Sequence, residues 1–447
     1  MFKQELTLFK GKHVLLLQGP VGSFFWRLAK DLESIGAIVS KINFNAGDWF
    51  FFPKNAVNYR GSLKDWPDFF QNFVRQRQID IVLLFGDARP IHRPLQFICR
   101  ELNITLGVFE EGYVRPNYVT FELCGVNGFS QLPKEPSFYL AQPMPIDTEK
   151  KHRQVGNTYW PMVRAGFLYF TVGALGKPFF RKYQHHRPLS LFEAWPWIKS
   201  AYRKVYYQKK EADLEQKILA KDAAPFFLVP LQVHNDAQIL HHSDFNTVED
   251  FIHTVIKSFA DAAPGHKKLI FKHHPMDRGY KNYNKLISKL AKRYQLEDRI
   301  HYIHDQSLPK LLDAAEGVVM INSTVGLSAI WHNAPTKIMG SAIYDMPGLT
   351  YQDSLDSFWT FANQYKIDKT LHKHFRHYLI THTQINGSFY KPFKENRTLA
   401  GLMLTMPKRA LSKSLAASLT ASKVPGIQTT QQLNELNDLN EHVSLSK

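Results

Sequence analysis

The sequence predicts an α/β protein with two Rossmann-like domains that face a central cleft. Short β-branched or leucine-rich runs alternate with helical patterns in two separate stretches of the chain. A chain of 447 residues is too long for one hydrophobic core and suits two domains of ordinary size. Hydrophobic residues make up 44% of the chain and aromatic residues 13%, so a large buried interior is expected.

The first alternating series predicts an N-terminal Rossmann-like domain over residues 1–150. An amphipathic helix follows the first strand and ends at Gly36. We expect a parallel sheet with helices on both faces, because uninterrupted apolar runs are typical of strands that are buried on both sides. The predicted strands are HVLLLQ (13–18), IVSKINF (38–44), IDIVLLF (79–85) and ITLGVF (104–109).

The second series predicts another Rossmann-like domain over residues 222–345. Its predicted strands are 226–232, 268–272, 299–303 and 317–321, and its predicted helices lie near 247–261, 281–295, 308–316 and 324–333. We expect residues 346–405 to form helices that return to the first domain. Residues 406–447 are rich in Ser, Thr, Gln and Asn and predict a disordered tail.

The segment between the two series, residues 151–221, is aromatic and basic, and we expect an irregular linker that contacts the membrane or the acceptor. The whole chain carries a net charge of +17, which favours a polyanionic partner or a negatively charged surface. Residues 181–210 hold eight Lys or Arg against Glu193 alone, with Trp and Tyr between them. This pattern suits the headgroup layer of an anionic membrane, and a solvated basic helix face beside a domain linker explains it equally well. Nucleic-acid binding is not expected, because no recognised motif accompanies the charge.

Cysteine usage and hydropathy indicate the compartment. The two cysteines, Cys99 and Cys124, cannot supply a disulfide framework, which favours a reducing interior. The N-terminus has no signal-peptide pattern. The longest apolar candidate, at 165–176, is shorter than the roughly 18 residues that a membrane span requires. We therefore expect a cytoplasmic protein whose membrane contact is peripheral.

Polar loops follow six of the predicted strands. They are QGPVGS, GDARPIH and EEGYVRP in the first series, and QVHND, KHHPMDRG and NSTVG in the second. Because ligands of open parallel sheets bind beyond the carboxyl ends of the strands, we expect these loops to line the cleft. The candidates on the acceptor side of the cleft are Gly19, Gly22, Asp87, Arg89 and Arg115.

The loops of the second series predict a phosphate site. Ser323 and Thr324 stand at the start of a predicted helix, whose free N–H groups and dipole favour an anion. Lys272, His273 and His274 come directly before Pro275, which restricts the loop and is expected to direct these side chains into the cleft. Each motif alone could serve a purely structural role, whereas two such loops from neighbouring strands favour a nucleotide phosphate. Gln232, in the third loop, is assigned to the same site.

The absence of an Asp-x-Asp motif indicates which type of nucleotide-sugar donor to expect. A pyrophosphate leaving group commonly requires a divalent metal held by an Asp-x-Asp pair, and the sequence contains none. A nucleoside monophosphate, neutralised by Lys272, His274 and a helix N-terminus, needs no metal. We therefore expect no metal and no cofactor, and a CMP-sugar is favoured over a UDP-sugar as donor.

Two adjacent carboxylates, Glu110 and Glu111, end the strand before the EEGYVRP loop. In a water-poor cleft their repulsion should raise the pKa of at least one of them and divide their roles between a nucleophile or base and a proton donor. Since adjacent strand residues face opposite ways, the alternative is that one of them pairs with Arg115 or Arg89. The residues alone do not select between the two roles.

Seven motifs together resemble the bacterial capsule polysaccharide biosynthesis proteins of the KpsS/LipB type, a family of retaining β-Kdo transferases. They are QGPVGSFFWRLAKDL, NFNAGDW, FGDARPIHRP, EEGYVRP, FKHHPMDRGY, INSTVGLSA and YDMPGLT, and the resemblance runs from about residue 13 to 350. The resemblance implies a GT-B architecture, CMP-Kdo as donor and an anionic glycerophospholipid, (lyso)phosphatidylglycerol with or without Kdo, as acceptor at the inner face of the cytoplasmic membrane. It also implies a second Kdo transferase and the capsule export complex as further partners.

The resemblance assigns roles to the candidate residues. Glu110 and Glu111 would supply the catalytic carboxylate, and Glu111 is favoured as nucleophile because related Kdo transferases carry an Asp at this position. Lys272, His274, Pro275, Ser323 and Thr324 would hold the CMP phosphate. The alternative function is a non-catalytic capsule assembly or export adaptor that keeps a GT-B shell.

Overall fold

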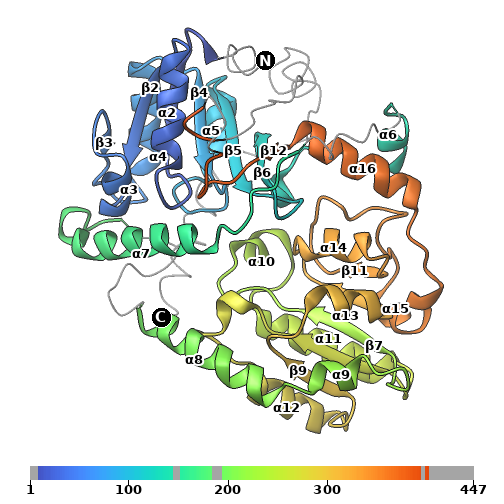
Figure 1. The fold of residues 1–447 in the computed structure, drawn as a ribbon. Helices are drawn as coiled ribbons and strands as arrows, with labels where there is room; N and C mark the ends of the chain where they lie inside the picture. Colours follow the sequence, from blue (N-terminus) through green and yellow to red (C-terminus); the bar gives the residue numbers. More distant parts are fainter. Residues whose placement is uncertain (1–8, 144–151, 184–193, 394–397, 402–447) are drawn as a thin grey trace.

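The computed structural model describes residues 9–143, 152–183, 194–393 and 398–401, and the predicted disordered tail lies outside them. These residues form two α/β domains, each built on one sheet (Figure 1). The predicted fold class, an α/β protein with two such domains, is confirmed.

The first domain holds a seven-stranded sheet in the order β12-β6-β5-β4-β1-β2-β3. Its strands are β1 (His13–Leu16), β2 (Ile38–Asn43), β3 (Val57–Asn58), β4 (Ile81–Phe85), β5 (Thr105–Glu111), β6 (Tyr118–Leu123) and β12 (Gln384–Asn386). The strands from β1 to β5 run parallel, whereas β6 is antiparallel to β5 and β12 is antiparallel to β6. The prediction of a wholly parallel sheet is therefore wrong at this edge.

The antiparallel edge arises because the chain reverses directly after the two carboxylates. A Cβ atom on Gly112 would lie 2.1 Å from the Tyr118 carbonyl oxygen, so only glycine permits this close return. The returning strand, YVTFEL, is β-branched and aromatic and pairs Glu110 with Thr120. The EEGYVRP motif therefore joins the end of β5 to the start of β6 instead of leading into a helix.

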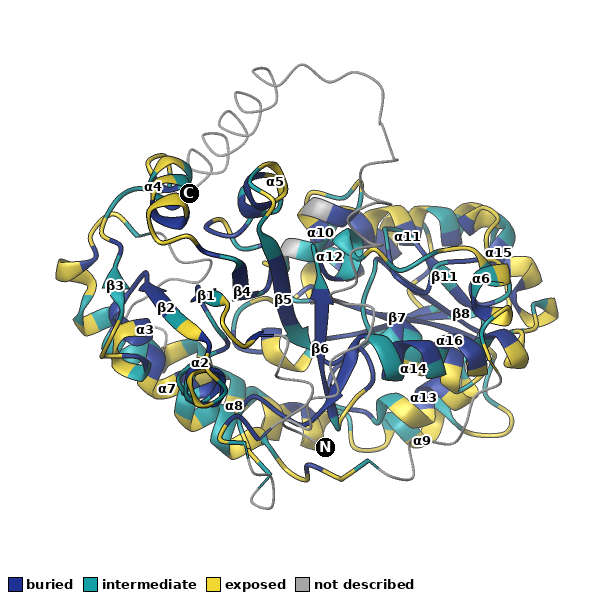
Figure 2. Cartoon of the chain, turned by 90° about the horizontal axis from the view of Figure 1, so that it is seen from above, coloured by how far each residue is buried: buried dark blue, intermediate teal, exposed yellow. Residues whose placement is uncertain are grey.

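Both faces of the first sheet are buried, which explains the unbroken apolar run of β1. Val14 and Leu16 pack into one core with α2 (Phe24–Ser34), whereas Leu15 and Leu17 pack into the other. That second core includes residues of α4 (Trp66–Gln76) and α5 (Leu95–Glu101). Figure 2 shows the buried strands between these two layers of helices, with exposed residues on their outer sides. A short helix, α3 (Ala46–Phe51), follows β2.

The second domain is a five-stranded sheet in the order β11-β10-β7-β8-β9, in which every pair is parallel. Its strands are β7 (Phe226–Pro230), β8 (Lys268–Lys272), β9 (Ile300–Ile303), β10 (Gly317–Met320) and β11 (Thr336–Ile338). Its helices are α10 (Ala237–His242), α11 (Val248–Ala262), α12 (Asn284–Arg293), α13 (Leu308–Ala314), α14 (Val325–Trp331) and α15 (Leu355–Phe361). The four predicted strands of this series and its four predicted helices are confirmed.

The chain then returns to the first domain. Helix α16 (Lys369–His382) leads into β12, which adds an edge strand beside β6. On its way α16 packs against α6 (Pro136–Leu140), where the Phe375 and Tyr139 rings lie 5.0 Å apart. A second contact between the domains joins His242 of α10 to Phe129 of the 3-10 turn η2 (Asn127–Phe129), with ring centroids 4.4 Å apart. This arrangement of two Rossmann-like domains is GT-B-like.

The segment between the domains is helical, so the expectation of an irregular segment is wrong. Helix α7 (Tyr159–Leu175) packs on α3 of the first domain, and a Cβ on Gly176 would lie 2.1 Å from the Ala46 Cβ. Helix α8 (Ala194–Lys210) packs on the second domain, where Arg203 donates to the Arg278 carbonyl oxygen at 2.7 Å. Another short helix, α9 (Leu214–Ile218), leads into β7. Within the described ranges, neither these helices nor any other has the length and apolarity needed to cross a membrane.

Candidate active site

Glu110 lies half-buried at the end of β5, against the loop that follows β4. A Cβ on Gly86 would lie 3.5 Å from both Glu110 Oε2 and Arg89 Nε, so this loop and the carboxylate are in contact range. The pKa of Glu110 is raised to about 7, chiefly by burial and also by the negative charges of Glu111 and Asp87. The hydrogen bond from the Glu111 N–H to Glu110 Oε1, at 2.9 Å, and the charge of Arg89 act in the opposite direction. Glu110 can therefore take up and release a proton near neutral pH.

Glu111, the last residue of β5, has different partners from Glu110. Its Oε1 accepts a hydrogen bond from the Tyr390 hydroxyl at 3.1 Å. Burial raises the pKa of Glu111, and the Arg115 charge and the Tyr390 hydrogen bond oppose this. The two carboxyl groups thus have separate partners. Burial, more than the mutual repulsion expected from the sequence, raises both pKa values.

The charge of Arg115 influences ionisable groups in both domains. It is exposed on the loop between β5 and β6, where its Nε donates to the Gly112 carbonyl oxygen at 3.3 Å. Its charge favours the ionised form of Glu111 in the first domain and the neutral form of His274 in the second. The carboxylate loop and the histidine loop therefore lie within electrostatic reach of the same side chain.

His274 begins the 3-10 turn η6 (Pro275–Asp277), and its Nδ1 accepts a hydrogen bond from the Met276 N–H at 3.2 Å. A nitrogen that accepts carries no proton, so the proton of the neutral ring is on Nε2, which bonds nothing in the described part of the chain. Burial lowers the pKa of His274, and Arg115 and Lys272 lower it further against the opposing charge of Asp277. His274 therefore offers a hydrogen-bond donor, where the sequence suggested a positive charge.

Lys272 and His273 are buried instead of projecting into the cleft as expected. Lys272 is buried and its Nζ donates to the His304 carbonyl oxygen at 2.7 Å; burial lowers its pKa to about 8. His273 is buried against Tyr302, with 2.6 Å between the ring Nδ1 and the tyrosine hydroxyl. Of these three neighbouring residues, only His274 is partly exposed and so accessible to a ligand.

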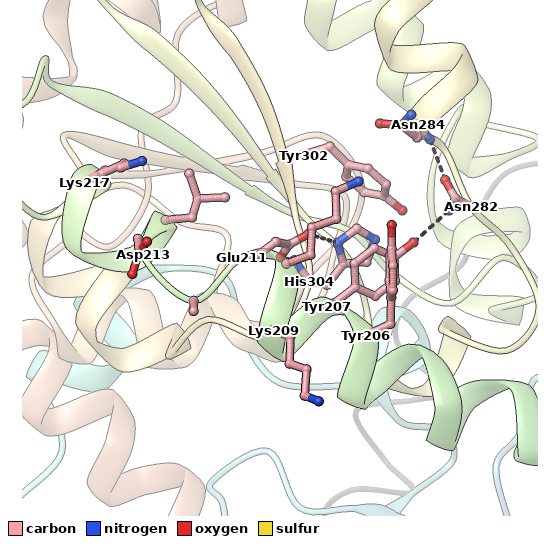
Figure 3. Close-up of a pocket in the computed structure, with 13 residues that line it drawn as sticks. Tyr206, Tyr207, Lys209, Glu211, Asp213, Lys217, Asn282, Asn284, Tyr302 and His304 are labelled. Atoms are coloured by element: carbon pink, nitrogen blue, oxygen red, sulfur yellow. Dashed lines mark hydrogen bonds and ion pairs between the residues drawn. The ribbon is translucent and has the colours of Figure 1, made fainter.

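A cavity of about 550 Å³ lies at the junction of α8, α9 and β9 (Figure 3). Inside it His304 stacks on Tyr207 at 3.4 Å, and its Nδ1–H donates to Glu211 Oε1 at 2.7 Å. Lys209, Lys210 and Lys217 add positive charge to the lining. None of the site residues predicted from the sequence lines this cavity, but Lys272 bonds the carbonyl oxygen of His304, which does.

Ser323, Thr324 and Gln232 lie at the ends of β10 and β7. Because β7 lies between β10 and β8, the expectation that the loops of Ser323 and His274 follow neighbouring strands is wrong. Thr324 is the N-cap residue of α14 and its side chain bonds no backbone N–H there, whereas Ser323 Oγ accepts from the Val325 N–H at 3.2 Å. Gln232 is buried, and its Nε2 donates to Asp236 Oδ2 and Asn322 Oδ1 at 3.0 Å each. Gln232 therefore holds the two loops together and has no amide hydrogen left for a ligand.

Two of the first-domain candidates, Arg89 and Gly19, are in contact at the end of β1. Arg89 Nη1 donates to Gln18 Oε1 at 2.9 Å and to the Gly19 carbonyl oxygen at 3.2 Å. Gly19 also permits the Phe25 ring to approach, since a Cβ there would lie 2.8 Å from it, and Gly22 has a φ of 108° that favours glycine. These two glycines shape a tight turn.

Asp87, another of these candidates, is buried. Its Oδ2 accepts from the Val126 N–H at 2.8 Å, and its Oδ1 bonds no group in the part of the chain that the structure describes. Burial raises the pKa of Asp87 to about 6, and the Val126 hydrogen bond lowers it. Asp87 adds to the negative charge that Glu110 experiences.

Sequence reasoning missed a histidine–aspartate pair that joins two of the second-domain loops. His234 Nδ1–H donates to Asp277 Oδ1 at 2.5 Å, and the His234 N–H donates to Oδ2 at 3.1 Å. Asp277 is fully buried. Both residues stand in the loops QVHND and KHHPMDRG, which were identified from the sequence, but the pairing depends on β7 and β8 being neighbours. Tyr390 was missed for the same reason, because no local signal connects it to Glu111.

These features define a protein with a GT-B glycosyltransferase-like fold that carries carboxylates on one domain and a His-Pro loop on the other. Residues 80–390 match the sequence model of the family described as "Capsule polysaccharide biosynthesis protein", and the chain belongs to this family. The family predicted from the seven motifs is therefore confirmed.

Two relatives cover most of this chain. It is 40% identical over 392 residues to the capsule polysaccharide export protein KpsS of Escherichia coli, covering 86% of this chain and 98% of that protein. It is also 40% identical over 387 residues to the capsule polysaccharide modification protein LipB of Neisseria meningitidis serogroup B, covering 85% and 92%.

Solved structures show more distant similarity. KpsC of Thermosulfurimonas dismutans, a beta Kdo 2,7 transferase, is 13% identical with a TM-score of 0.37, covering 84% of this chain and 92% of that chain. A glycosyltransferase from Rickettsia africae is 12% identical with a TM-score of 0.33, covering 82% and 94%. Similarity at this level identifies neither substrate nor mechanism.

Proposed function

We propose that this protein is a retaining glycosyltransferase that moves Kdo from CMP-Kdo to (lyso)phosphatidylglycerol and so starts the poly-Kdo linker of a capsular polysaccharide. The observation that carries the proposal is a pair of carboxylates at the end of β5 in one domain and a histidine with a free donor, His274, after β8 in the other. The charge of Arg115 influences the pKa of both Glu111 and His274. A nucleophile and a group that receives the departing nucleotide must lie on either side of the same sugar carbon. Membership of the capsule polysaccharide biosynthesis family supports this reaction class.

In the first step, the Glu111 carboxylate attacks the anomeric carbon of Kdo. A bond forms between this carbon and a carboxylate oxygen while the bond to the CMP phosphate oxygen breaks, and CMP leaves with the electron pair. Glu111 is assigned as nucleophile because Arg115 and the Tyr390 hydrogen bond both favour its ionised form, although burial raises its pKa.

In the second step, an acceptor hydroxyl attacks the same carbon and the ester to Glu111 breaks. The hydroxyl proton passes to Glu110, whose pKa of about 7, raised by burial, suits a general base at neutral pH. Two inversions at one carbon leave its configuration unchanged, which is the meaning of a retaining reaction.

The CMP phosphate is assigned to the second domain. His274 Nε2–H would donate to a phosphate oxygen, and Ser323 and Thr324 at the start of α14 would bind the same phosphate from the far side of β7. Lys272 adds positive charge from a buried position and Pro275 shapes the loop. No divalent metal is included, because the sequence lacks the Asp-x-Asp pair that commonly holds one on a pyrophosphate.

The proposal is tested by incubating the protein with CMP-Kdo and a fluorescent lyso-phosphatidylglycerol and analysing products by mass spectrometry. We expect a product heavier by one or more Kdo units, and none with a Glu111→Gln variant. If no Kdo-bearing product forms under varied detergent conditions, the enzyme assignment is wrong. Capsule export in cells that carry a Glu110→Gln/Glu111→Gln double variant would then support the adaptor function.

A further inference from the structure

Helix α7 presents an apolar stripe to solvent. Trp160, Phe167 and Leu175 are 66%, 65% and 64% exposed, and Leu168 is 42% exposed. Their spacing of seven, eight and fifteen residues from Trp160 places them on one side of the helix. The opposite side, with Gly166, Tyr169 and Gly173, is buried. A continuous apolar stripe on a water-exposed helix marks an interaction surface.

Neighbouring elements extend this stripe. Helix α3, which packs against α7, exposes Trp49 at 46% and Phe50 at 43%. The 3-10 turn η4 (Lys177–Phe179), which follows α7, exposes Phe179 at 67%. We call these residues together the α7 face: Trp49, Phe50, Trp160, Phe167, Leu168, Leu175 and Phe179.

The chain segment that carries most of the α7 face is basic and has no acidic residue in its described parts up to the end of α8. Residues 152–183 and 194–210, the described parts of the interdomain segment up to the end of α8, hold ten Lys or Arg and no Asp or Glu. Arg164, which lies on the exposed side of α7, and Lys177 are within the stripe itself. Helix α8 lies on the same flank of the molecule and exposes Trp195 and Tyr202 at 67% and 70% (Figures 1 and 2). Aromatic rings together with cations suit the headgroup layer of an anionic membrane.

We infer that the α7 face is a monotopic docking surface for an anionic phospholipid membrane, with the aromatic and leucine side chains in the headgroup and acyl boundary. The inference rests on the proposed function only for the choice of a phospholipid membrane as partner. It narrows the membrane contact expected for residues 151–221 to α7 and the elements beside it, whereas charge alone had selected residues 181–210. At 17 residues, α7 lies along the membrane instead of crossing it.

The same helix forms part of the wall of the first-domain site. Tyr169, on the buried side of α7, donates from its hydroxyl to Asp48 Oδ1 at 2.9 Å and accepts from Gln18 Nε2 at 3.1 Å. Gln18 Oε1 accepts from Arg89, which is adjacent to Glu110. The thickness of one helix therefore separates the α7 face from the hydrogen-bond network around the carboxylates. A lipid held at this surface would be next to the acceptor side of the site.

The test measures sedimentation of the full chain with vesicles and needs no turnover. Vesicles of phosphatidylglycerol with phosphatidylcholine are compared with vesicles of phosphatidylcholine alone. The test variant is Trp160→Ser/Phe167→Ser, and the matched control is Phe97→Ser, since Phe97 is 51% exposed on α5, on the opposite side of the first domain (Figure 2). We expect the wild type and the control to bind the anionic vesicles, and the test variant to bind at least roughly tenfold more weakly, because two aromatic side chains lose their burial.

Three results would overturn the inference. The test variant could bind as tightly as wild type, binding could be equal on neutral vesicles, or the wild type could be a dimer that ignores vesicles and that the test variant converts to monomers. The last result would assign the α7 face to a second copy of the chain. CMP binding by the test variant is measured in parallel by calorimetry and should be unchanged. Loss of vesicle binding with intact CMP binding separates failure of docking from failure of the proposed reaction.

Discussion

Tyr390 donates a hydrogen bond from its hydroxyl to Oε1 of Glu111, over 3.1 Å, although 279 residues separate the two in the sequence. The contact forms because α16 and β12 bring the end of the described chain back to the first sheet. One of the two candidate carboxylates is therefore completed by a segment that follows the second domain.

Replacing Tyr390 by Phe should move the acid limb of the pH–rate profile to higher pH. Burial raises the pKa of Glu111 and the Tyr390 hydrogen bond lowers it, so removing the bond raises it further. A nucleophile with a higher pKa is ionised only at higher pH. The measurement is kcat/KM as a function of pH, with Tyr365→Phe as control because Tyr365 donates to the Thr350 carbonyl oxygen in the second domain. An unshifted profile would contradict the role of this bond.

Glu110→Gln should lower kcat by roughly 10²–10⁴-fold, the usual contribution of a general base. Burial raises the pKa of Glu110 to about 7, so the wild-type rate should fall as the pH decreases through that value and the base becomes protonated. The variant should lack this limb. A variant that keeps both the wild-type rate and the limb near pH 7 would exclude Glu110 as the base.

His274→Ala should weaken CMP binding roughly tenfold to a hundredfold, the cost of losing a hydrogen bond to a charged group. Glu111→Gln should leave CMP affinity nearly unchanged and reduce turnover by on the order of 10³-fold or more, because it removes the nucleophile. Calorimetry gives the affinities and product formation gives the rates. Equal effects of the two changes on both quantities would show that the roles are wrongly assigned.

Chelation should leave turnover unchanged. The departing group in the proposed reaction is a nucleoside monophosphate, held by a neutral histidine and a helix start instead of a metal. The experiment compares initial rates after dialysis against EDTA, with and without added Mg²⁺ or Mn²⁺. A rate that falls on chelation and returns with one of these ions would require a metal step in the reaction.

Ionisation of the buried Glu122 carboxyl group should make the protein less stable as the pH rises toward 8. Burial raises the pKa of Glu122 to about 7, whereas hydrogen bonds from Ser130 and Tyr113 lower it. The folded state therefore favours the protonated form, and this contribution is fully present below the pKa of the unfolded state and is lost as the pH rises through the folded pKa of about 7. Thermal unfolding at pH 6 and pH 8 should show a larger decrease in Tm for wild type than for Glu122→Gln. Equal decreases would show that Glu122 does not titrate in this range.

Much of the second domain could be predicted because its signals are local. The strand 268–272 was predicted with the bounds that the structure gives, since a short apolar run bounded by turn residues is typical of a buried strand. The edge of the first sheet could not be predicted in the same way. The strands β6 and β12 pair because α16 returns the chain to this edge, and no local pattern in either segment specifies its partner.

The sequence by itself determined the two α/β domains, the family and the loops that carry chemistry, because apolar periodicity and motif spacing are properties of neighbouring residues. Only the tertiary structure decided what each charged group does. It gave Glu110 and Glu111 different partners and bonded Lys272 to a backbone carbonyl. It also left Nε2 of His274 without a partner among the described residues and placed Arg115 where its charge influences groups of both domains. The physical reason is that burial and charge–charge interactions, which shift the pKa values, depend on distances between segments far apart in the chain.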